Sequence, residues 1–150
     1  MHVLVDTSVW SLAFRRRAEH LNPTEQRIAV ELAELIVEGR RELIGIVRQE
    51  LLSGIRFANQ FEKLRNRLRA FPDEPLAVQD YELAARASNR CRTAGISGTV
   101  TDFLLCAISS SRGWPIFTTD PDFERYAKVL SLQLHLPRNE GATGSPVELP

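Results

Sequence analysis

The sequence predicts an α/β fold with a central parallel sheet. Two observations lead to this prediction: short, uninterrupted apolar runs recur along the chain, and stretches with helical spacing of apolar residues separate them. Strands that alternate with helices in one chain form parallel sheets joined by right-handed crossovers. The length of 150 residues, with 43% hydrophobic and 25% charged residues, suits one globular domain with a sizeable core.

The first half of the chain predicts strand, helix, helix, strand and helix in that order. The clearest signal is a helix start at Asn22, with Pro23 at the first helical position and Glu25 placed for a capping box. Gly39 ends this helix. The expected elements are a strand at 2–5, a helix at 8–14, a helix at 23–38, a strand at 43–47 and a short helix at 48–53.

The second half begins with an amphipathic helix whose opposite face is basic. One apolar stripe defines it: Phe57, Phe61, Leu64, Leu68 and Phe71. Asp80 is expected to cap the next helix, which runs to Gly95, and Thr99 or Thr101 opens the one after it. The remaining elements are a short strand at 76–78, a strand at 114–118, a helix at 122–129 and a last strand at 130–136.

This order of elements predicts one domain over residues 1–136, built on a sheet of four to five strands. Residues 137–150 contain three prolines and two glycines and are expected to form a tail outside the core.

Four acidic residues are placed by this topology near one edge of the sheet. Asp6 follows the first strand directly, and Glu50 lies just past the second strand, at the start of its helix. Asp120 follows the strand that ends near residue 119, and Asp102 lies in the first turn of a helix. Open α/β sheets bind their ligands at the carboxyl ends of their strands. Capping or the helix dipole explains each acid alone, but four acids at one edge indicate a site.

A cluster of carboxylates favours a divalent metal ion. Acids at close range repel one another, so a bound cation would stabilise the cluster. Oxygen ligands without histidine or cysteine select Mg²⁺ or Mn²⁺ rather than zinc. Such a metal activates water for phosphodiester hydrolysis. Thr7, Ser8 and Thr118 add hydroxyls that can orient the acids or hold a phosphate, although capping or the filling of strand ends explains each at least as well.

Basic residues gather in two places although the formal net charge is zero. Arg15, Arg16 and Arg17 follow the first helix, and a second basic group lies between Gly54 and Phe71. A solvated helix face explains either group alone, while the two together fit an anionic partner. No apolar run has membrane-spanning length and no secretory signal is apparent, so we expect a cytoplasmic protein with no membrane partner and two reduced core cysteines.

Three segments resemble the PIN-domain ribonucleases. They are VLVDTSVW at the start, VRQELLSGI around Glu50, and TVTDFLLCAISSSRGWPIFTTDPDF from Thr99 to Phe123. The chain is most similar to the VapC toxins of bacterial VapBC toxin–antitoxin pairs, over nearly all of residues 2–136. The resemblance implies a three-layer α/β/α fold. It also implies an endoribonuclease that requires Mg²⁺ or Mn²⁺ and cleaves structured RNA such as tRNA or rRNA.

The same resemblance implies roles for single residues, which fall into four groups. The catalytic acids are Asp6, Glu50, Asp102 and Asp120; the metal ligands are expected among Asp6, Asp102, Asp120 and Asp122; Thr7, Ser8 and Thr118 are accessory; and Arg15, Arg16 and Arg56 are candidates for binding RNA or an antitoxin. Asp122 competes with Asp120 for the fourth acid position. The family further implies a homodimer and a VapB-like antitoxin whose C-terminal segment crosses the active-site groove. The apolar stripe could receive a partner helix, and ordinary core packing explains that stripe at least as well.

Other functions stay open at this point. A catalytically inactive PIN-like module for protein binding is one alternative, against which the four filled acid positions argue. A phosphatase with Asp6 as nucleophile is a second, but Ser8 stands where its usual second aspartate is needed. A phosphoacceptor signalling domain fits less well, because no acidic pair precedes the acceptor strand.

Overall fold

The computed structural model describes residues 1–138 and shows strands and helices in the alternation expected of an α/β protein. In chain order the elements are β1 (Val3–Val5), α1 (Thr7–Phe14), the 3₁₀ helix η1 (Ala18–His20), α2 (Pro23–Val37), β2 (Arg41–Glu42), α3 (Gly45–Leu52), α4 (Ala58–Leu68), α5 (Val78–Thr93), α6 (Val100–Arg112), β3 (Ile116–Phe117) and α7 (Asp122–Leu130).

The sheet within residues 1–138 has three strands in the order β2-β1-β3, and both pairings are parallel. The expectation of four to five strands is therefore wrong. The strand predicted at 130–136 is reduced to one isolated parallel bridge between Ile116 and Leu134. The reason is that α7 continues to Leu130 and Ser131 then takes a left-handed conformation, with φ of 55°, which leaves little extended chain.

Two further strand predictions are wrong because apolar runs belong to helices. The run predicted as a strand at 43–47 contains the start of α3, which begins at Gly45 and buries Val47 and Leu51 on one face. A short apolar run does not by itself distinguish a buried strand from a buried helix. The predicted strand at 76–78 is also absent. Val78 is 68% exposed and opens α5, and the Asp80 carboxylate accepts the amide of Ala77 rather than occupying the cap position itself.

Two helix starts follow the sequence pattern closely. Asn22 caps α2, with a complete capping box formed with Glu25 and Pro23 at the first position. Thr99 caps α6 in the same way together with Asp102. These reciprocal bonds satisfy amides that would otherwise lack partners at the helix start.

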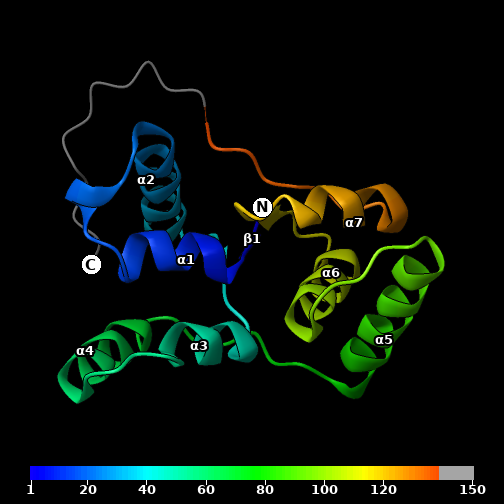
Figure 1. The fold of residues 1–150 in the computed structure, drawn as a ribbon, viewed down its shortest axis with the longest axis horizontal. Coiled ribbons are helices and arrows are strands. Elements are labelled where there is room, and N and C mark those ends of the chain that lie inside the picture. The colour runs from blue at the N-terminus through cyan, green and yellow to red at the C-terminus, as the bar shows by residue number, and fades with distance from the viewer. Residues whose placement is uncertain (139–150) are drawn as a thin grey trace.

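The helices divide into two groups on either side of the sheet (Figure 1). Helices α1 to α4 form one group, in which α1 packs on α2 and on α3, and α3 packs on α4. Helices α5, α6 and α7 pack on one another and form the other group, with α6 also against β3. The central strand β1 is completely buried between them, as an all-apolar Val3-Leu4-Val5 segment requires in a sheet covered on both faces.

Hydrogen bonds and ion pairs hold the segment after Leu134 against α2. Glu31 is only 3% exposed and accepts hydrogen bonds from His135, at 2.8 Å, and from Arg138. Arg138 also pairs with Glu34 and Glu38 on the same helix. Of the predicted tail, residues 139–150 lie outside the described residues. No helix within residues 1–138 is long and apolar enough to cross a bilayer.

Candidate active site

Asp6 is held rigidly at the junction of β1 and α1. Its amide donates to the carbonyl oxygen of Phe117 in β3 at 2.9 Å, and its own carbonyl accepts the amides of Val9 and Trp10 in the first turn of α1. The side chain is 6% exposed. The apolar strand before it and the helix after it therefore fix the backbone from which this carboxylate projects.

Two hydroxyl groups orient the Asp6 carboxylate. Ser8 Oγ and Thr118 Oγ1 each donate to Asp6 Oδ2 at 2.8 Å. The same Thr118 oxygen accepts the amide of Asp120 at 3.0 Å, and the Ser8 oxygen accepts the amide of Thr119 at 3.0 Å. Asp6 and Asp120 are thus joined through Thr118, across the gap between β1 and the segment that follows β3.

Asp102 is oriented by a buried tyrosine from α7. It is the third residue of α6, and its Oδ2 accepts the hydroxyl of Tyr126 at 2.7 Å. Tyr126 is completely buried and packs against Phe103 and Phe123. A Cβ atom at Gly98 would lie 2.3 Å from the tyrosine oxygen and 2.8 Å from its ring carbon Cζ. A glycine at position 98 is therefore needed for Tyr126 to reach Asp102.

Asp6 and Asp102 share one negative electrostatic environment. Burial raises the pKa of the Asp6 carboxyl group, and the charge of Asp102 raises it further, against the opposing hydrogen bonds from Thr118, Ser8 and the Thr7 amide. Burial also raises the pKa of the Cys106 thiol, to which the charges of Asp102 and Asp6 add. Both carboxylates are therefore close enough to the buried face of α6 to act on the same thiol.

Asp120 and Asp122 belong to the same environment through Tyr126. Burial raises the pKa of the Tyr126 hydroxyl, and its bond to Asp102 and the charges of Asp122 and Asp120 add to the rise. The two acids differ in their contacts. Asp120 Oδ1 accepts the amide of Asp122 at 2.9 Å, whereas the Asp122 carboxylate forms an exposed ion pair with Arg125 at 3.3 Å.

Glu50 stands apart from these aspartates. The expectation that it starts its helix is wrong, because α3 begins at Gly45 and Glu50 lies near its end. Its side chain is exposed, and within residues 1–138 no hydrogen bond or ion pair links it to Asp6, Asp102 or Asp120. The helix that carries it, α3, packs against α1.

The donor set fits a hard divalent cation by its chemistry. The groups that meet here are carboxylates and hydroxyls, the oxygen ligands that suit Mg²⁺ and Mn²⁺. A cation would favour the ionised form of Asp6, which burial and Asp102 now penalise. The hydroxyl of Thr7, directly after Asp6, is buried and has no hydrogen-bond partner among the described residues. As the side chains stand, residues 1–138 hold no group of three Asp, Glu, His or Cys residues close enough to bind an ion.

The three basic residues proposed for binding RNA or an antitoxin separate in the structure. Arg16 forms an ion pair with Glu25 in the first turn of α2. Arg15 and Arg56 instead line a pocket between the end of α1 and the start of α4.

The residues of the predicted apolar stripe differ in burial. Leu64, Leu68 and Phe71 are buried in the core, while Phe57 is 58% exposed.

Sequence reasoning missed Tyr126 and Gly98. The signal for Tyr126 was present, because it lies three residues after Phe123 on the apolar face of a helix, and a buried tyrosine hydroxyl needs a polar partner. No such signal exists for Gly98. Its neighbour across the fold is distant in sequence, and a close approach of this kind leaves no pattern in a single chain.

These observations define the chain as an α/β protein with an acidic site at the carboxyl end of a parallel sheet. The PIN domain family model matches residues 3–129, and the chain therefore belongs to the PIN domain family. It is similar to VapC ribonuclease Mb1587 of Mycobacterium bovis and to ribonuclease VapC11 of Mycobacterium tuberculosis. With each it shares 28% identity over 137 residues, which cover 87% of this chain and 96% of the relative. The predicted resemblance is confirmed.

The fold has a solved counterpart. A chain in the crystal structure of FitAcB from Neisseria gonorrhoeae matches with a TM-score of 0.70 at 20% sequence identity, over 90% of this chain and 97% of that chain. At this identity the match shows a common fold, and it supports the α/β architecture described above.

Proposed function

We propose that this protein is a metal-dependent endoribonuclease that hydrolyses RNA phosphodiester bonds with Mg²⁺ or Mn²⁺. The observation that carries the proposal is the pair Asp6 and Asp102. The two carboxylates interact electrostatically, each is oriented by hydroxyl donors, and burial of Asp6 is costly without a positive counter-charge. Membership in the PIN domain family and the similarity to proteins named as ribonucleases support the same chemistry.

In this proposal Asp6, Asp102 and Asp120 would hold the metal ion, whose chemistry when bound would be to activate water and to offset negative charge on the leaving oxygen. The chain's own residues orient the ligands. Thr118 and Ser8 hold Asp6, and Tyr126 holds Asp102. We keep Glu50, which is exposed on α3, as a further member of the proposed catalytic set.

We assign the fourth acid position to Asp120 rather than Asp122. Asp120 is connected to Asp6 through the Thr118 hydroxyl, which its amide contacts at 3.0 Å. Asp122 is the first residue of α7 and pairs with the exposed Arg125. Asp120→Asn should therefore weaken Mn²⁺ binding more than Asp122→Asn, as measured by isothermal titration. A larger loss with Asp122→Asn would reverse the assignment.

The test of the function is RNA cleavage by purified protein. We expect cleavage of total RNA with Mn²⁺ or Mg²⁺, none with EDTA, and a loss of roughly 10²- to 10⁴-fold in Asp102→Asn, because a metal contributes several kcal/mol to charge stabilisation. Glu82→Gln, an exposed acid on α5, is the matched control and should cleave normally. Equal cleavage by Asp102→Asn would overturn the proposal. Metal binding without cleavage of any RNA would favour the inactive protein-binding alternative.

By the same resemblance we propose a VapB-like antitoxin as a partner and a homodimer as the assembly. Co-expression with the product of any short reading frame found next to the gene, followed by light scattering on a sizing column, tests both. Cleavage that persists in the co-purified complex would contradict the role of that partner as an inhibitor.

A further inference from the structure

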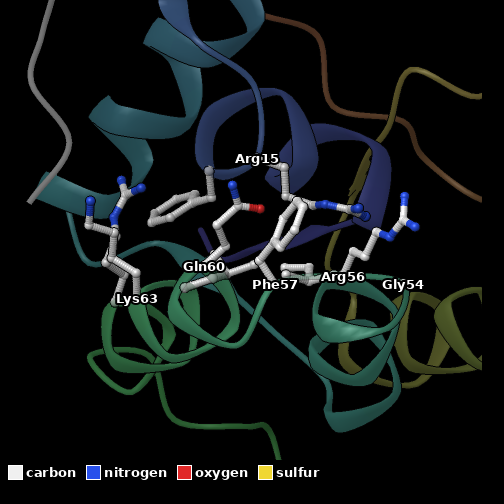
Figure 2. Close-up of a pocket in the computed structure, with 10 residues that line it drawn as sticks. Arg15, Gly54, Arg56, Phe57, Gln60 and Lys63 are labelled. Atoms are coloured by element: carbon white, nitrogen blue, oxygen red, sulfur yellow. The ribbon is translucent and has the colours of Figure 1, made fainter.

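A pocket of about 410 Å³ lies at the end of α1 that is remote from Asp6. Three segments line it: the end of α1, the loop between α3 and α4, and the first turns of α4. We call it the basic pocket, and its defining residues are Arg15, Arg56, Phe57, Lys63 and Arg67. Arg15 and Arg56 lie at one end and Lys63 at the other, with Phe57 and Gln60 between them (Figure 2). A volume of this size lies within the range of small-ligand pockets.

The cations of this pocket have no acidic partner among residues 1–138. Arg15, Arg56 and Lys63 are exposed, and within residues 1–138 none of their side chains forms an ion pair or a hydrogen bond. Neighbouring cations behave differently, since Arg16 pairs with Glu25 and Arg65 pairs with Glu62. Among residues 1–138, no acidic residue lines the pocket. Unpaired positive charges around one concave surface attract an anion.

The pocket also offers an aromatic surface. Phe57 is 58% exposed at the edge of the pocket, although it belongs to a stripe whose other members are largely buried. The guanidinium of a fourth cation, Arg67, lies 4.4 Å from the ring centre of Phe14, which also lines the pocket. Proteins that bind single-stranded nucleic acid combine exposed aromatic rings with cations, because bases stack on the rings while the phosphates pair with the positive charges.

We propose that the basic pocket binds one nucleotide of a single-stranded RNA segment, with its base on Phe57 and its flanking phosphates on Arg15, Arg56 and Lys63. The inference rests on the proposed ribonuclease function and extends it by placing a substrate-binding subsite. Helix α1 separates the two sites. The helical rise gives about 13 Å between Asp6 and Arg15, which corresponds to roughly four stacked nucleotides. A strand held here would extend toward the acids.

The experiment is fluorescence anisotropy with a fluorescein-labelled 12-nucleotide single-stranded RNA, carried out in EDTA so that binding is measured without cleavage. Arg15→Ala and Arg56→Ala should each weaken binding and reduce the slope of log affinity against log salt by about 0.7, the value for one phosphate contact on a single strand. Phe57→Ala should weaken binding roughly 5- to 150-fold with the salt slope unchanged, and Phe57→Tyr should restore it. Arg92→Ala, which removes an exposed charge from α5 at the other end of the molecule, is the control and should bind like the unchanged protein (Figure 1).

Three outcomes separate the possibilities. The first outcome concerns the triple variant Arg15→Ala/Arg56→Ala/Phe57→Ala. If its RNA affinity, salt slope and melting temperature are those of the unchanged protein, the proposal is overturned. Loss of binding to a poly-glutamate peptide in that variant, with RNA binding intact, would overturn it in favour of an acidic protein partner. The expected binding pattern in a protein that cleaves no RNA would leave the pocket in place and reject only the proposed nuclease function.

Discussion

The two ends of α1 carry opposite chemistry. At its start Asp6 is buried, acidic and held by hydroxyl donors, and Asp102 and Asp120 lie around it. At its end Arg15 is exposed and without an acidic partner in the described residues, beside Arg56 and Lys63. The first site carries negative charge that neighbouring cations do not neutralise, and the second carries positive charge that neighbouring acids do not neutralise.

The contrast shows why a formal net charge of zero gave little guidance about partners. Opposite charges that could have paired within the fold are instead kept at separate sites. Each site is therefore electrostatically incomplete and would be neutralised by a different ligand, a cation at the acids and a polyanion at the pocket. If this division is correct, substitutions at the two ends should change different properties.

The largest effect is expected at the acidic end. Asp6→Ala should lower kcat for RNA cleavage by roughly 10²- to 10⁴-fold with little change in KM, because it removes a metal ligand rather than a substrate contact. Arg15→Ala should act mainly on KM. Steady-state cleavage of a fluorogenic single-stranded RNA with Mn²⁺ measures both. A variant Asp6→Ala that raised only KM would contradict the division between the two ends.

A smaller loss is expected when the acid remains but its orienting group is removed. Tyr126→Phe keeps the buried ring and removes only the hydroxyl that Asp102 accepts at 2.7 Å. Mn²⁺ affinity and cleavage should fall by about 10- to 100-fold, the range for groups that orient metal ligands. Isothermal titration measures the affinity. Tyr81→Phe, at a tyrosine that is 55% exposed, is the control and should bind Mn²⁺ normally. Unchanged Mn²⁺ affinity in Tyr126→Phe would show that the bond is only structural.

The contact behind Tyr126 predicts a stability effect. Gly98→Ala places a Cβ atom against the tyrosine ring and should lower the free energy of unfolding by about 1–3 kcal/mol, the usual cost of overpacking. Urea unfolding measures the difference. The double variant Gly98→Ala/Tyr126→Leu should lose less stability than the sum of its two single variants, because leucine does not reach position 98. Strict additivity would argue that the two residues do not contact each other.

The burial of Asp6 predicts a pH-dependent effect on stability, in which the substitution stabilises the protein instead of destabilising it. Its pKa is raised in the folded protein, so its contribution to stability is fully present below the ordinary value of 3.8 and is lost as pH rises through the folded value. Asp6→Asn should therefore be more stable than the unchanged protein at pH 7 in EDTA, and the gain should vanish below about pH 3.8. Excess Mn²⁺ should reverse the order at pH 7. A gain of equal size at both pH values would point to a cause other than charge.

The smallest effect is expected at Arg16. Its exposed ion pair with Glu25 makes it a poor candidate for binding RNA, and such pairs contribute about 0–1 kcal/mol to stability. Arg16→Ala should change single-stranded RNA affinity less than about 2-fold under conditions in which Arg15→Ala reduces the salt slope by a full phosphate contact. Equal losses of RNA affinity in the two variants would show that the RNA-binding surface is not confined to the basic pocket.

The sequence predicted the elements whose signals are local. The capping residues Asn22 and Thr99 and the strand that ends at Asp6 follow rules that act within a few residues, and all three are present. The strand predicted at 43–47 failed because a continuous apolar run has two solutions, and packing of Val47 and Leu51 selected a helix. The hydroxyl pair on Asp6 was visible as residue types, but its geometry needed β3 beside β1. The pairing of Arg16 and the isolation of Arg15 were beyond prediction, because both depend on where α2 and α4 pack.

The fit between Gly98 and Tyr126 has a consequence for how relatives of this chain vary. A side chain at position 98 would collide with the tyrosine oxygen and with its ring carbon Cζ, so a change to phenylalanine at 126 does not relieve the clash. We therefore expect the two positions to change together. Homologues that carry alanine or a larger residue at 98 should carry a shorter residue at 126, and in those proteins the aspartate at 102 will have exchanged its tyrosine for another donor or for water.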